Sequence, residues 1–314
     1  MRPGRLRLRQ VRRLQGARDH KNPPLPPAGE RHRNAQGQPA EVYLTDRFLE
    51  PVTPHTHILF EGQLIHEERS KYQHIQVYRH EYYGHILVLD GLLQTTTADE
   101  FIYHEMIAHV PLCSLPREPR RVLIVGGGDG GALAQVLRHP TVEEVVVVDL
   151  DEAVPRVSRR FFPFAASFDD PRVRLVIDDG ARFVKSPEAR RAFDCAIVDS
   201  SDPDTPASVL YRTAFYSDLK KCLAPDSVVI HQVGTPEFMR KELADTFAAV
   251  SAVFDRASVC HAAIFTYGGS EAFVLGSSFD PSVPRRVMRG KWYNPEIHAA
   301  SFALPEFWKD VIGA

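Results

Sequence analysis

Acidic residues stand directly after several strand-like segments of the chain. They are Asp129, Asp149, Asp151, Asp178, Asp179, Asp199 and Asp202. Ligands of open α/β sheets bind beyond the carboxyl ends of the parallel strands. Carboxylates gathered there raise one another's pKa values unless a cation lies among them, so the pattern indicates a site for a polycation. Taken singly, Asp129 and Asp179 are explained equally well as helix N-caps.

A glycine-rich turn precedes the first predicted helix of this series. Gly126, Gly128 and Gly131 have the G-x-G-x-x-G spacing that lets a nucleotide-type ligand approach the backbone. Asp149 closes the next strand, where its carboxylate would accept hydrogen bonds from ribose hydroxyls. Asp129 lies where the pyrophosphate of a dinucleotide would rest, and two anions at about 4 Å repel by roughly 1 to 4 kcal/mol. The loop therefore favours a positively charged nucleoside, such as an adenosyl sulfonium compound.

The elements that position these residues fall into two parts. Short alternating strands between residues 41 and 90, at 57–60, 72–78 and 86–89, predict a small antiparallel sheet, and an apolar stripe predicts a helix over 98–109. After a linker at 116–119, apolar strands alternate with helices, which predicts a parallel sheet covered on both faces. The strands are expected at 122–125, 145–148, 173–177, 195–198 and 228–230, and the helices near 130–138, 152–160, 210–222 and 236–250.

We therefore predict an α/β fold with a Rossmann-like, methyltransferase-type parallel sheet and a small N-terminal antiparallel β domain. The β domain with its helix is expected over 41–115 and the catalytic domain over 116–314. Residues 1–40 carry nine Arg and one Lys against two acids, a charge of +8, and include Pro23, Pro24, Pro26 and Pro27. Their lack of an apolar period predicts a disordered arm, either a solvated tail or an over-long start. The acidic remainder disfavours nucleic acid as a partner.

Composition excludes several other classes of protein. Of the 314 residues, 44% are hydrophobic and 25% charged, as in soluble globular proteins. No run of eighteen apolar residues exists, so no membrane span is expected. The four cysteines, Cys113, Cys195, Cys222 and Cys260, form no C-x-x-C pair, which argues against a disulfide framework and a zinc site and favours the cytoplasm.

Several separated motifs carry a family resemblance. They are Tyr72-Gln73, Leu89-Asp-Gly91 with Gln94, Asp99-Glu-Phe-Ile-Tyr-His-Glu-Met106, Gly126-Gly-Gly-Asp-Gly-Gly131 and Asp199-Ser-Ser-Asp-Pro203. With them the chain resembles spermidine synthases, the polyamine aminopropyltransferases, from about His66 to Pro305. The closing segment, 293–305, looks like the bacterial branch.

The resemblance implies a reaction and a set of site residues. The donor would be decarboxylated S-adenosylmethionine, a co-substrate rather than a bound cofactor, and the acceptor usually putrescine. The products would be spermidine and methylthioadenosine. The implied donor-site residues are Gln73 at the thioadenosyl group, Asp149 at the ribose, Asp179 and Gly180 at the adenine, and Pro206 at the adenine face. The implied polyamine-site residues are Asp99, His104, Asp129, Tyr83, Tyr267, Asp199 as the proton acceptor and Asp202 at the distal amine. No metal is implied, and a homodimer or homotetramer is expected.

The residue types alone, apart from the family resemblance, are suited to this reaction. An alkylammonium with a pKa near 10 has no lone pair. Removing its proton at neutral pH, about 3 units below that pKa, costs roughly 4 kcal/mol. A positioned carboxylate such as Asp199 can take that proton while Asp202 anchors the other nitrogen. The sulfonium leaves as a neutral thioether, so neither a metal nor a covalent intermediate is required.

Departures from the family pattern leave alternatives open. The family usually has Glu at Asp149, Arg-Glu at Ala134-Gln135, Gly at Thr205 and Pro at Phe265, and one residue is missing after Tyr267. Cadaverine, agmatine or spermidine therefore remain possible acceptors. A methyltransferase and an inactive polyamine-binding protein are further alternatives, whereas Asp129 and the preceding β domain disfavour a dehydrogenase. His104 could simply pair with Glu100 along its helix, and Tyr83 and Tyr267 could be packed aromatics.

Overall fold

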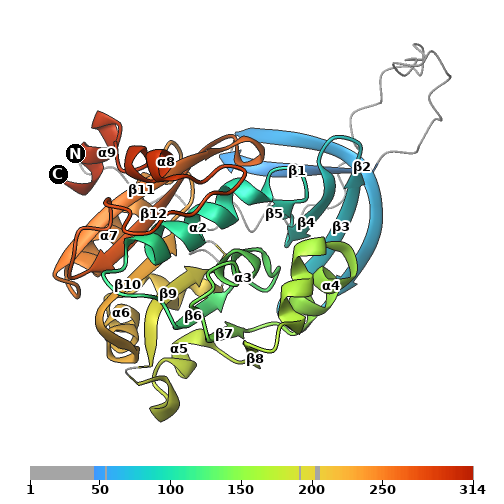
Figure 1. Ribbon diagram of the computed structural model, residues 1–314. Helices are drawn as coiled ribbons and strands as arrows, with labels where there is room; N and C mark the ends of the chain where they lie inside the picture. The colour runs from blue at the N-terminus through green and yellow to red at the C-terminus, as the bar shows by residue number, and fades with distance from the viewer. Residues whose placement is uncertain (1–45, 54, 191, 202–205, 314) are drawn as a thin grey trace. The chain divides into compact units, whose positions relative to one another are not determined.

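The computed structural model describes residues 46–53, 55–190, 192–201 and 206–313 (Figure 1). These residues fall into two compact units, divided between Gln63 and Leu64. The predicted disordered arm, 1–40, lies outside the described residues. So do Asp202 and Thr205, and of Pro206 only the backbone is described.

The first unit contains an antiparallel hairpin. Strand β1 (Asp46–Thr53) pairs with the first half of β2 (Thr56–Arg69). Phe48 and Phe60 are register partners, and their rings stack at 4.9 Å. Both rings are buried, as the two-residue period of a strand requires for one apolar face.

The second unit begins with the antiparallel sheet that the sequence predicts. Strands β3 (His74–His80), β4 (Gly84–Leu89) and β5 (Leu92–Thr96) follow one another in the sheet. Asp90 and Gly91 join β4 to β5 with φ values of 52° and 86°. Asp and Gly suit the left-handed region that such a two-residue hairpin turn needs.

A seven-stranded sheet forms the larger part of this unit, in the order β11-β12-β10-β9-β6-β7-β8. The parallel strands are β6 (Arg121–Gly126), β7 (Glu144–Asp149), β8 (Val173–Ile177), β9 (Phe193–Asp199) and β10 (Leu223–Gln232). Strands β11 (Arg256–Ile264) and β12 (Gly269–Ser277) add an antiparallel edge that the sequence analysis does not anticipate. The predicted fold class is confirmed, since the five parallel strands lie where they are expected.

Helices cover both faces of this sheet (Figure 1). They are α2 (Glu100–Ser114), α3 (Gly131–Val136), α4 (Ala153–Phe161), α5 (Gly180–Phe183), α6 (Thr213–Cys222), α7 (Arg240–Ser251), α8 (Pro295–Ala300) and α9 (Glu306–Ile312), with 3-10 turns η1 (Pro163–Asp169), η2 (Pro187–Ala189), η3 (Pro206–Tyr211) and η4 (Phe265–Tyr267). Ile124 of β6 packs into one core with Met106 of α2 and Leu133 of α3. The next residue, Val125, packs into the opposite core with Phe215 of α6. Successive residues of one strand therefore hold helices on opposite faces.

The helix predicted over 98–109 is longer than expected. It runs to Ser114 through Pro111, and every residue from Ile102 to Ser114 is buried. A helix that is buried on all sides lacks the one-sided apolar stripe whose end is used to predict where a helix ends.

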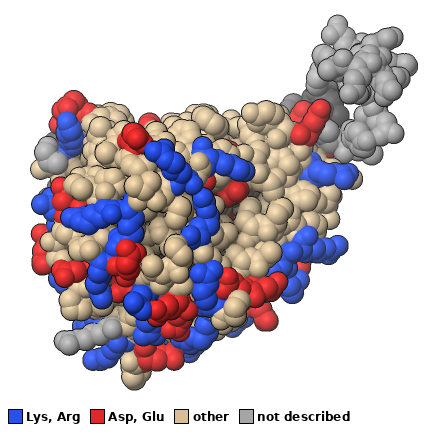
Figure 2. All heavy atoms as spheres, in the orientation of Figure 1, with Lys and Arg blue, Asp and Glu red and all other residues tan. Residues whose placement is uncertain are grey.

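The surface and the cysteines show no unusual feature. On the face drawn in Figure 2, basic and acidic side chains are interspersed. The four cysteines are buried free thiols. Among the helices that the structure describes, none has the length and apolar character of a membrane span.

Candidate functional site

The site lies where the order of the parallel strands reverses. The chain adds β7 and β8 on one side of β6 and then returns to place β9 on the other side. At this reversal Gly126 is the register partner of Asp199, and the Gly127 amide donates to the Asp199 carbonyl at 2.8 Å. Ligands of open α/β sheets bind in the crevice at such a switch point, so the strand ends put Asp199 where a ligand is expected.

Glycines let the loop after β6 lie directly against two carboxylate residues. Gly126 has a φ of 84°, and a Cβ on it would lie 2.0 Å from the Asp199 carbonyl oxygen. A Cβ on Gly128 would lie 2.5 Å from Oδ2 of Asp149. The loop backbone therefore leaves no room for larger residues beside Asp199 and Asp149.

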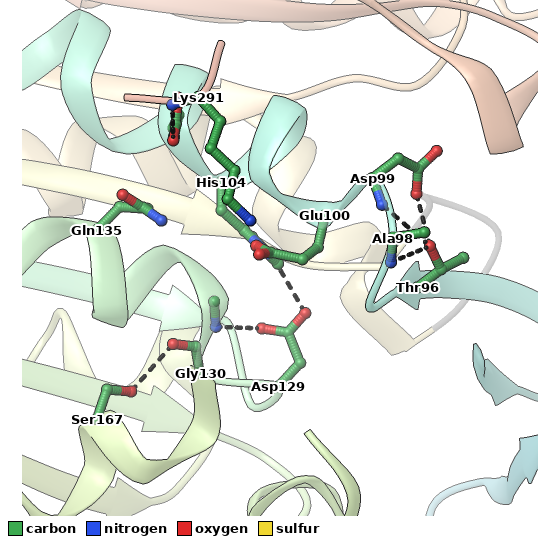
Figure 3. Close-up of polar contacts among 12 residues, drawn as sticks. Thr96, Ala98, Asp99, Glu100, His104, Asp129, Gly130, Gln135, Ser167 and Lys291 are labelled. Atoms are coloured by element: carbon green, nitrogen blue, oxygen red, sulfur yellow. Dashed lines mark hydrogen bonds and ion pairs between the residues drawn. The ribbon is translucent and has the colours of Figure 1, made fainter. Parts of the chain in front are cut away.

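Asp129, His104 and Glu100 form a charged network across α2 and the glycine loop (Figure 3). His104 Nε2 lies 3.2 Å from Oδ2 of Asp129, and its Nδ1 lies 2.6 Å from Oε2 of Glu100. Burial opposes protonation of His104, but the Asp129 and Glu100 carboxylates raise its pKa well above the usual value. The ring is therefore a buried cation shared by two anions, and the pairing with Glu100 and the approach to Asp129 are both present.

Asp129 has a second partner besides His104. Its Oδ1 accepts a hydrogen bond from the Gly131 amide at 2.8 Å, at the start of α3. Burial would raise the pKa of Asp129, yet His104 and this amide lower it. Asp129 therefore stays ionised, with one oxygen on the helix start and the other on His104.

Asp199 and Asp149 differ from Asp129 in having raised pKa values. Burial and the Asp129 charge raise the pKa of Asp199 to about 6. Burial raises the pKa of Asp149 to about 6 as well, with the Asp151 and Asp199 charges adding to the effect. Both groups are ionised at neutral pH but basic enough to hold a proton, which is the property of a general base.

Among the described residues, one hydrogen-bond donor contacts the Asp199 carboxylate. The hydroxyl of Tyr103, on α2, donates to Oδ1 at 2.6 Å. Sequence analysis did not single out Tyr103, although it lies within the motif that contains Asp99 and His104. The contact joins residues 96 positions apart, and no local pattern predicts it.

Gln73 lies beside the end of β7 through Asp151. Its Nε2 donates to Oδ2 of Asp151 at 2.9 Å, and the Ser70 hydroxyl donates to the same oxygen at 2.6 Å. The other oxygen of Asp151 accepts from the Ala153 amide at the start of α4. Asp151 therefore orients Gln73 toward the same strand ends as Asp149.

Asp179 and Gly180 follow β8. The Asp179 carboxylate accepts from the Ala181 amide at 2.8 Å and so caps α5, which is the simple explanation noted from the sequence. Its side chain is exposed. A Cβ on Gly180 would meet the Val125 side chain at 2.4 Å, so the start of α5 packs closely on β6.

The remaining predicted residues differ in how they are placed. The Asp99 carboxylate accepts from the Thr96 hydroxyl at 2.7 Å and from the hydroxyl and amide of Thr266 at 2.9 and 3.2 Å. The Tyr267 hydroxyl donates to the Gln94 carbonyl at 2.6 Å. Asp99 and Tyr267 thus fix η4 to the end of β5 and the start of α2.

Three predicted residues remain: Tyr83 is described with its side chain, Pro206 by its backbone only, and Asp202 not at all. Tyr83 is half-buried in the turn between β3 and β4, where its amide donates to the His80 ring. Pro206 begins η3. Asp202 lies outside the described residues. A buried carboxylate that the sequence analysis did not name, Glu271 on β12, accepts from the Gly234 amide at 3.0 Å and raises the pKa values of Tyr103 and Tyr267.

Comparisons with known proteins show the family of the chain. Residues 100–285 match the family model of the spermine/spermidine synthase domain, and residues 62–97 match that of the spermidine synthase tetramerisation domain. The chain is 42% identical over 253 residues to a polyamine aminopropyltransferase of Thermoanaerobacter sp. strain X514, covering 78% of this chain and 90% of that protein. It is 40% identical over 262 residues to the spermidine synthase of Schizosaccharomyces pombe, covering 80% and 87%.

A solved structure is similar over most of the chain. A spermidine synthase in complex with the transition state analogue AdoDATO superimposes with a TM-score of 0.82 at 32% identity, covering 88% of this chain and 97% of that one.

Proposed function

Because the chain belongs to the spermine/spermidine synthase family and is a polyamine aminopropyltransferase, we propose that it makes spermidine from putrescine. The donor is decarboxylated S-adenosylmethionine. An amine nitrogen of putrescine forms a bond to the aminopropyl carbon beside the sulfonium, and the bond between that carbon and sulfur breaks. The sulfonium leaves as the neutral thioether methylthioadenosine.

The observation that carries the proposal is that two carboxylates at the switch point have raised pKa values. Asp149 and Asp199 have pKa values of about 6 because burial and neighbouring anions disfavour their charge. His104 lowers the pKa of Asp199 only in part, since its ring is paired with Asp129 and Glu100. A bound sulfonium and a bound alkylammonium would supply positive charge at this point.

Asp199 takes the role of the proton acceptor. The attacking nitrogen enters as an ammonium, whose proton must leave before its lone pair can attack. The Asp199 carboxylate is ionised at neutral pH, and its raised pKa narrows the gap to the amine. It ends β9 beside the glycine loop, where the donor would lie.

The donor is assigned to the strand ends on the β7 side. Asp149 would accept hydrogen bonds from the ribose hydroxyls through its side facing Gly128. Gln73, oriented by Asp151, would contact the thioadenosyl group. We assign Asp179, Gly180 and Pro206 to the adenine on the strength of the family pattern.

The acceptor is assigned to the side of α2 and η4. Asp129 and His104 would line the aminopropyl and polyamine channel, with Tyr83, Tyr267 and Asp99 at its walls and Asp202 at the distal amine. Asp99 would act there through η4, because its carboxylate binds Thr266. We expect no metal or bound cofactor, since the leaving thioether is neutral.

Assembly into a dimer or tetramer forms a separate part of the proposal. It is supported by the match of residues 62–97 to the tetramerisation domain of spermidine synthases. Light scattering coupled to gel filtration measures the state, and a monomer at micromolar concentration would overturn it.

The substrate assignment is tested by methylthioadenosine release with decarboxylated S-adenosylmethionine and four amines: putrescine, cadaverine, agmatine and spermidine. Putrescine is expected to have the highest kcat/KM. One methylene in a shaped pocket is worth about 1 to 3 kcal/mol, so cadaverine should react roughly 10- to 200-fold less efficiently. A higher kcat/KM with any other amine would overturn the choice of putrescine.

A further inference from the structure

Glu271 is a buried carboxylate at the sheet edge that carries the site, and the proposed reaction does not yet use it. It is the third residue of β12, with 3% of its surface exposed. Because β12 runs antiparallel to β10, its first residues lie at the edge where the parallel strands end. Its Oε1 accepts a hydrogen bond from the Gly234 amide at 3.0 Å, just beyond the end of β10. The strand direction therefore brings Glu271 to the same edge as Asp199.

The strand register places Glu271 relative to Asp199. His231 of β10 pairs with Val198 on one side and with Val274 on the other. Asp199 is one residue nearer the site edge than Val198. Glu271 is three residues nearer that edge than Val274. Strands β9 and β12 are two strand spacings apart, about 10 Å, so a molecule that meets both carboxylates must carry two separated positive charges.

The two side chains share the face of the sheet that α2 covers. Ile197 of β9 and Phe273 of β12 belong to the core that packs against α2. Asp199 and Glu271 each lie two residues from one of them, and alternate residues of a strand point to the same face. The Phe273 ring also lies 5.5 Å from the Tyr103 ring on α2, measured between centroids.

Two tyrosines feel the charges of both carboxylates. Burial raises the pKa values of Tyr103 and Tyr267 well above the ordinary value of 10, and the charges of Asp199 and Glu271 raise them further. Among the charges that raise the pKa of Tyr267, that of Glu271 has the largest effect. The two tyrosine rings lie 6.3 Å apart, measured between centroids. Glu271 and Asp199 therefore act on the same part of the proposed acceptor channel, whose wall includes Tyr267.

We propose that Glu271 is a specificity-determining residue, whose carboxylate binds the distal ammonium of a diamine while Asp199 takes a proton from the attacking one. The inference rests on the proposed function, and it adds a second carboxylate to the amine for which the family pattern implies Asp202. An ammonium has three N–H donors, so two carboxylates can bind it together. Glu271 follows the position where the chain lacks one residue of the family pattern, so no role is carried over to it from the family. Such a residue selects acceptors with a positive charge at both ends.

The test is Glu271→Gln, which keeps an oxygen for the Gly234 amide and removes the charge. Methylthioadenosine release is measured with putrescine as the substrate and n-butylamine as a competitor. n-Butylamine has the same carbon chain without the distal nitrogen, and its inhibition constant measures binding whether or not it reacts. The KM for putrescine is expected to rise about tenfold, while the inhibition constant of n-butylamine and kcat each stay within about threefold. An unchanged KM for putrescine, or an equal loss of affinity for both amines, would overturn the role.

Glu105→Gln is the matched control. Glu105 is also a buried glutamate, with 2% of its surface exposed, and its carboxylate accepts from the backbone amides of Lys291, Trp292 and Tyr293. It lies outside the proposed site, so the KM for putrescine should stay within about twofold in this variant. A rise in KM as large as that of Glu271→Gln would show that loss of any buried charge is sufficient, and the specific role of Glu271 would be overturned.

Glu271→Asp decides the matter if the glutamine variant does not fold. Aspartate keeps the charge, but its carboxylate is one methylene shorter, so a longer diamine should reach it better. The ratio of kcat/KM for cadaverine to that for putrescine is expected to rise about tenfold. An unchanged ratio would overturn the role.

The wild type separates this inference from the proposed function. A wild type that releases no methylthioadenosine with any amine would overturn the function itself. An active wild type with unaffected Glu271 variants would overturn the role of Glu271 alone. A wild type that prefers cadaverine would overturn the choice of putrescine, and n-pentylamine then replaces n-butylamine in the test of Glu271.

Discussion

Replacing Asp199 by Asn is expected to stabilise the fold while it removes the proposed base. The pKa of Asp199 is raised from 3.8 to about 6, so the folded state disfavours the ionised side chain. One pKa unit corresponds to about 1.36 kcal/mol. At pH 7.5 the ionised carboxylate therefore costs about 3 kcal/mol of the free energy of unfolding, which the neutral, nearly isosteric amide would recover.

The pH dependence of this gain identifies its cause. Between about pH 6 and 4 the folded protein binds the Asp199 proton more tightly than the unfolded chain does, so the wild type gains stability as the pH falls through this window. Asparagine does not titrate. The advantage of Asp199→Asn should therefore fall from about 3 kcal/mol at pH 7.5 to about 1.6 kcal/mol at pH 5.

Urea unfolding at the two pH values measures both effects. Asp129→Asn is the control, because the pKa of Asp129 is lowered by His104 and by the Gly131 amide. That variant should be less stable than the wild type at pH 7.5. The reasoning fails if Asp199→Asn is no more stable than the wild type at pH 7.5, or if its advantage is the same at pH 5.

Three further outcomes are expected. Gly131→Ala should lower stability by about 2 to 4 kcal/mol, because a Cβ there would lie 2.0 Å from Cε1 of His104, which Asp129 and Glu100 hold in place; an unchanged melting temperature would contradict this. Burial lowers the pKa of His139 from 6.5 to about 4, so the unfolded state binds more protons than the folded state between these values, and protonation of His139 should lower the free energy of unfolding by about 2 kcal/mol between pH 8 and pH 5; a His139→Gln variant with the wild-type dependence of stability on pH would argue against it. Deleting residues 1–40 should leave kcat and the melting temperature unchanged, since the segment has no apolar pattern to bury; a tenfold rise in KM would show otherwise.

The parallel strands and the site edge could be predicted because they depend on local patterns. The segments at 122–125 and 145–148 are continuous apolar runs, as strands covered on both faces must be. The segment at 173–177 lies at the edge of the sheet, and its mostly apolar run is interrupted by Arg174. The carboxyl ends of parallel strands meet at one edge, so Asp149 and Asp199 could be placed together without knowledge of the strand order.

The contacts between distant elements could not be predicted in this way. The Tyr103 hydroxyl meets Asp199 across 96 residues, and the Thr266 hydroxyl meets Asp99 across 167. Both contacts depend on how α2 packs against β9 and η4, and the hydrophobic periodicity of the sequence does not predict this packing. The antiparallel pair β11 and β12 was also missed, although it carries Glu271, whose charge raises the pKa values of Tyr103 and Tyr267.

The most direct test of the central claim is the rate of methylthioadenosine release by wild type and Asp199→Asn across pH 6 to 9, with saturating donor and putrescine. If Asp199 accepts the ammonium proton, the variant should lose at least a hundredfold in kcat at pH 7.5 and recover steeply as the pH rises and free amine becomes available. Turnover within threefold of the wild type at pH 7.5 would contradict the account.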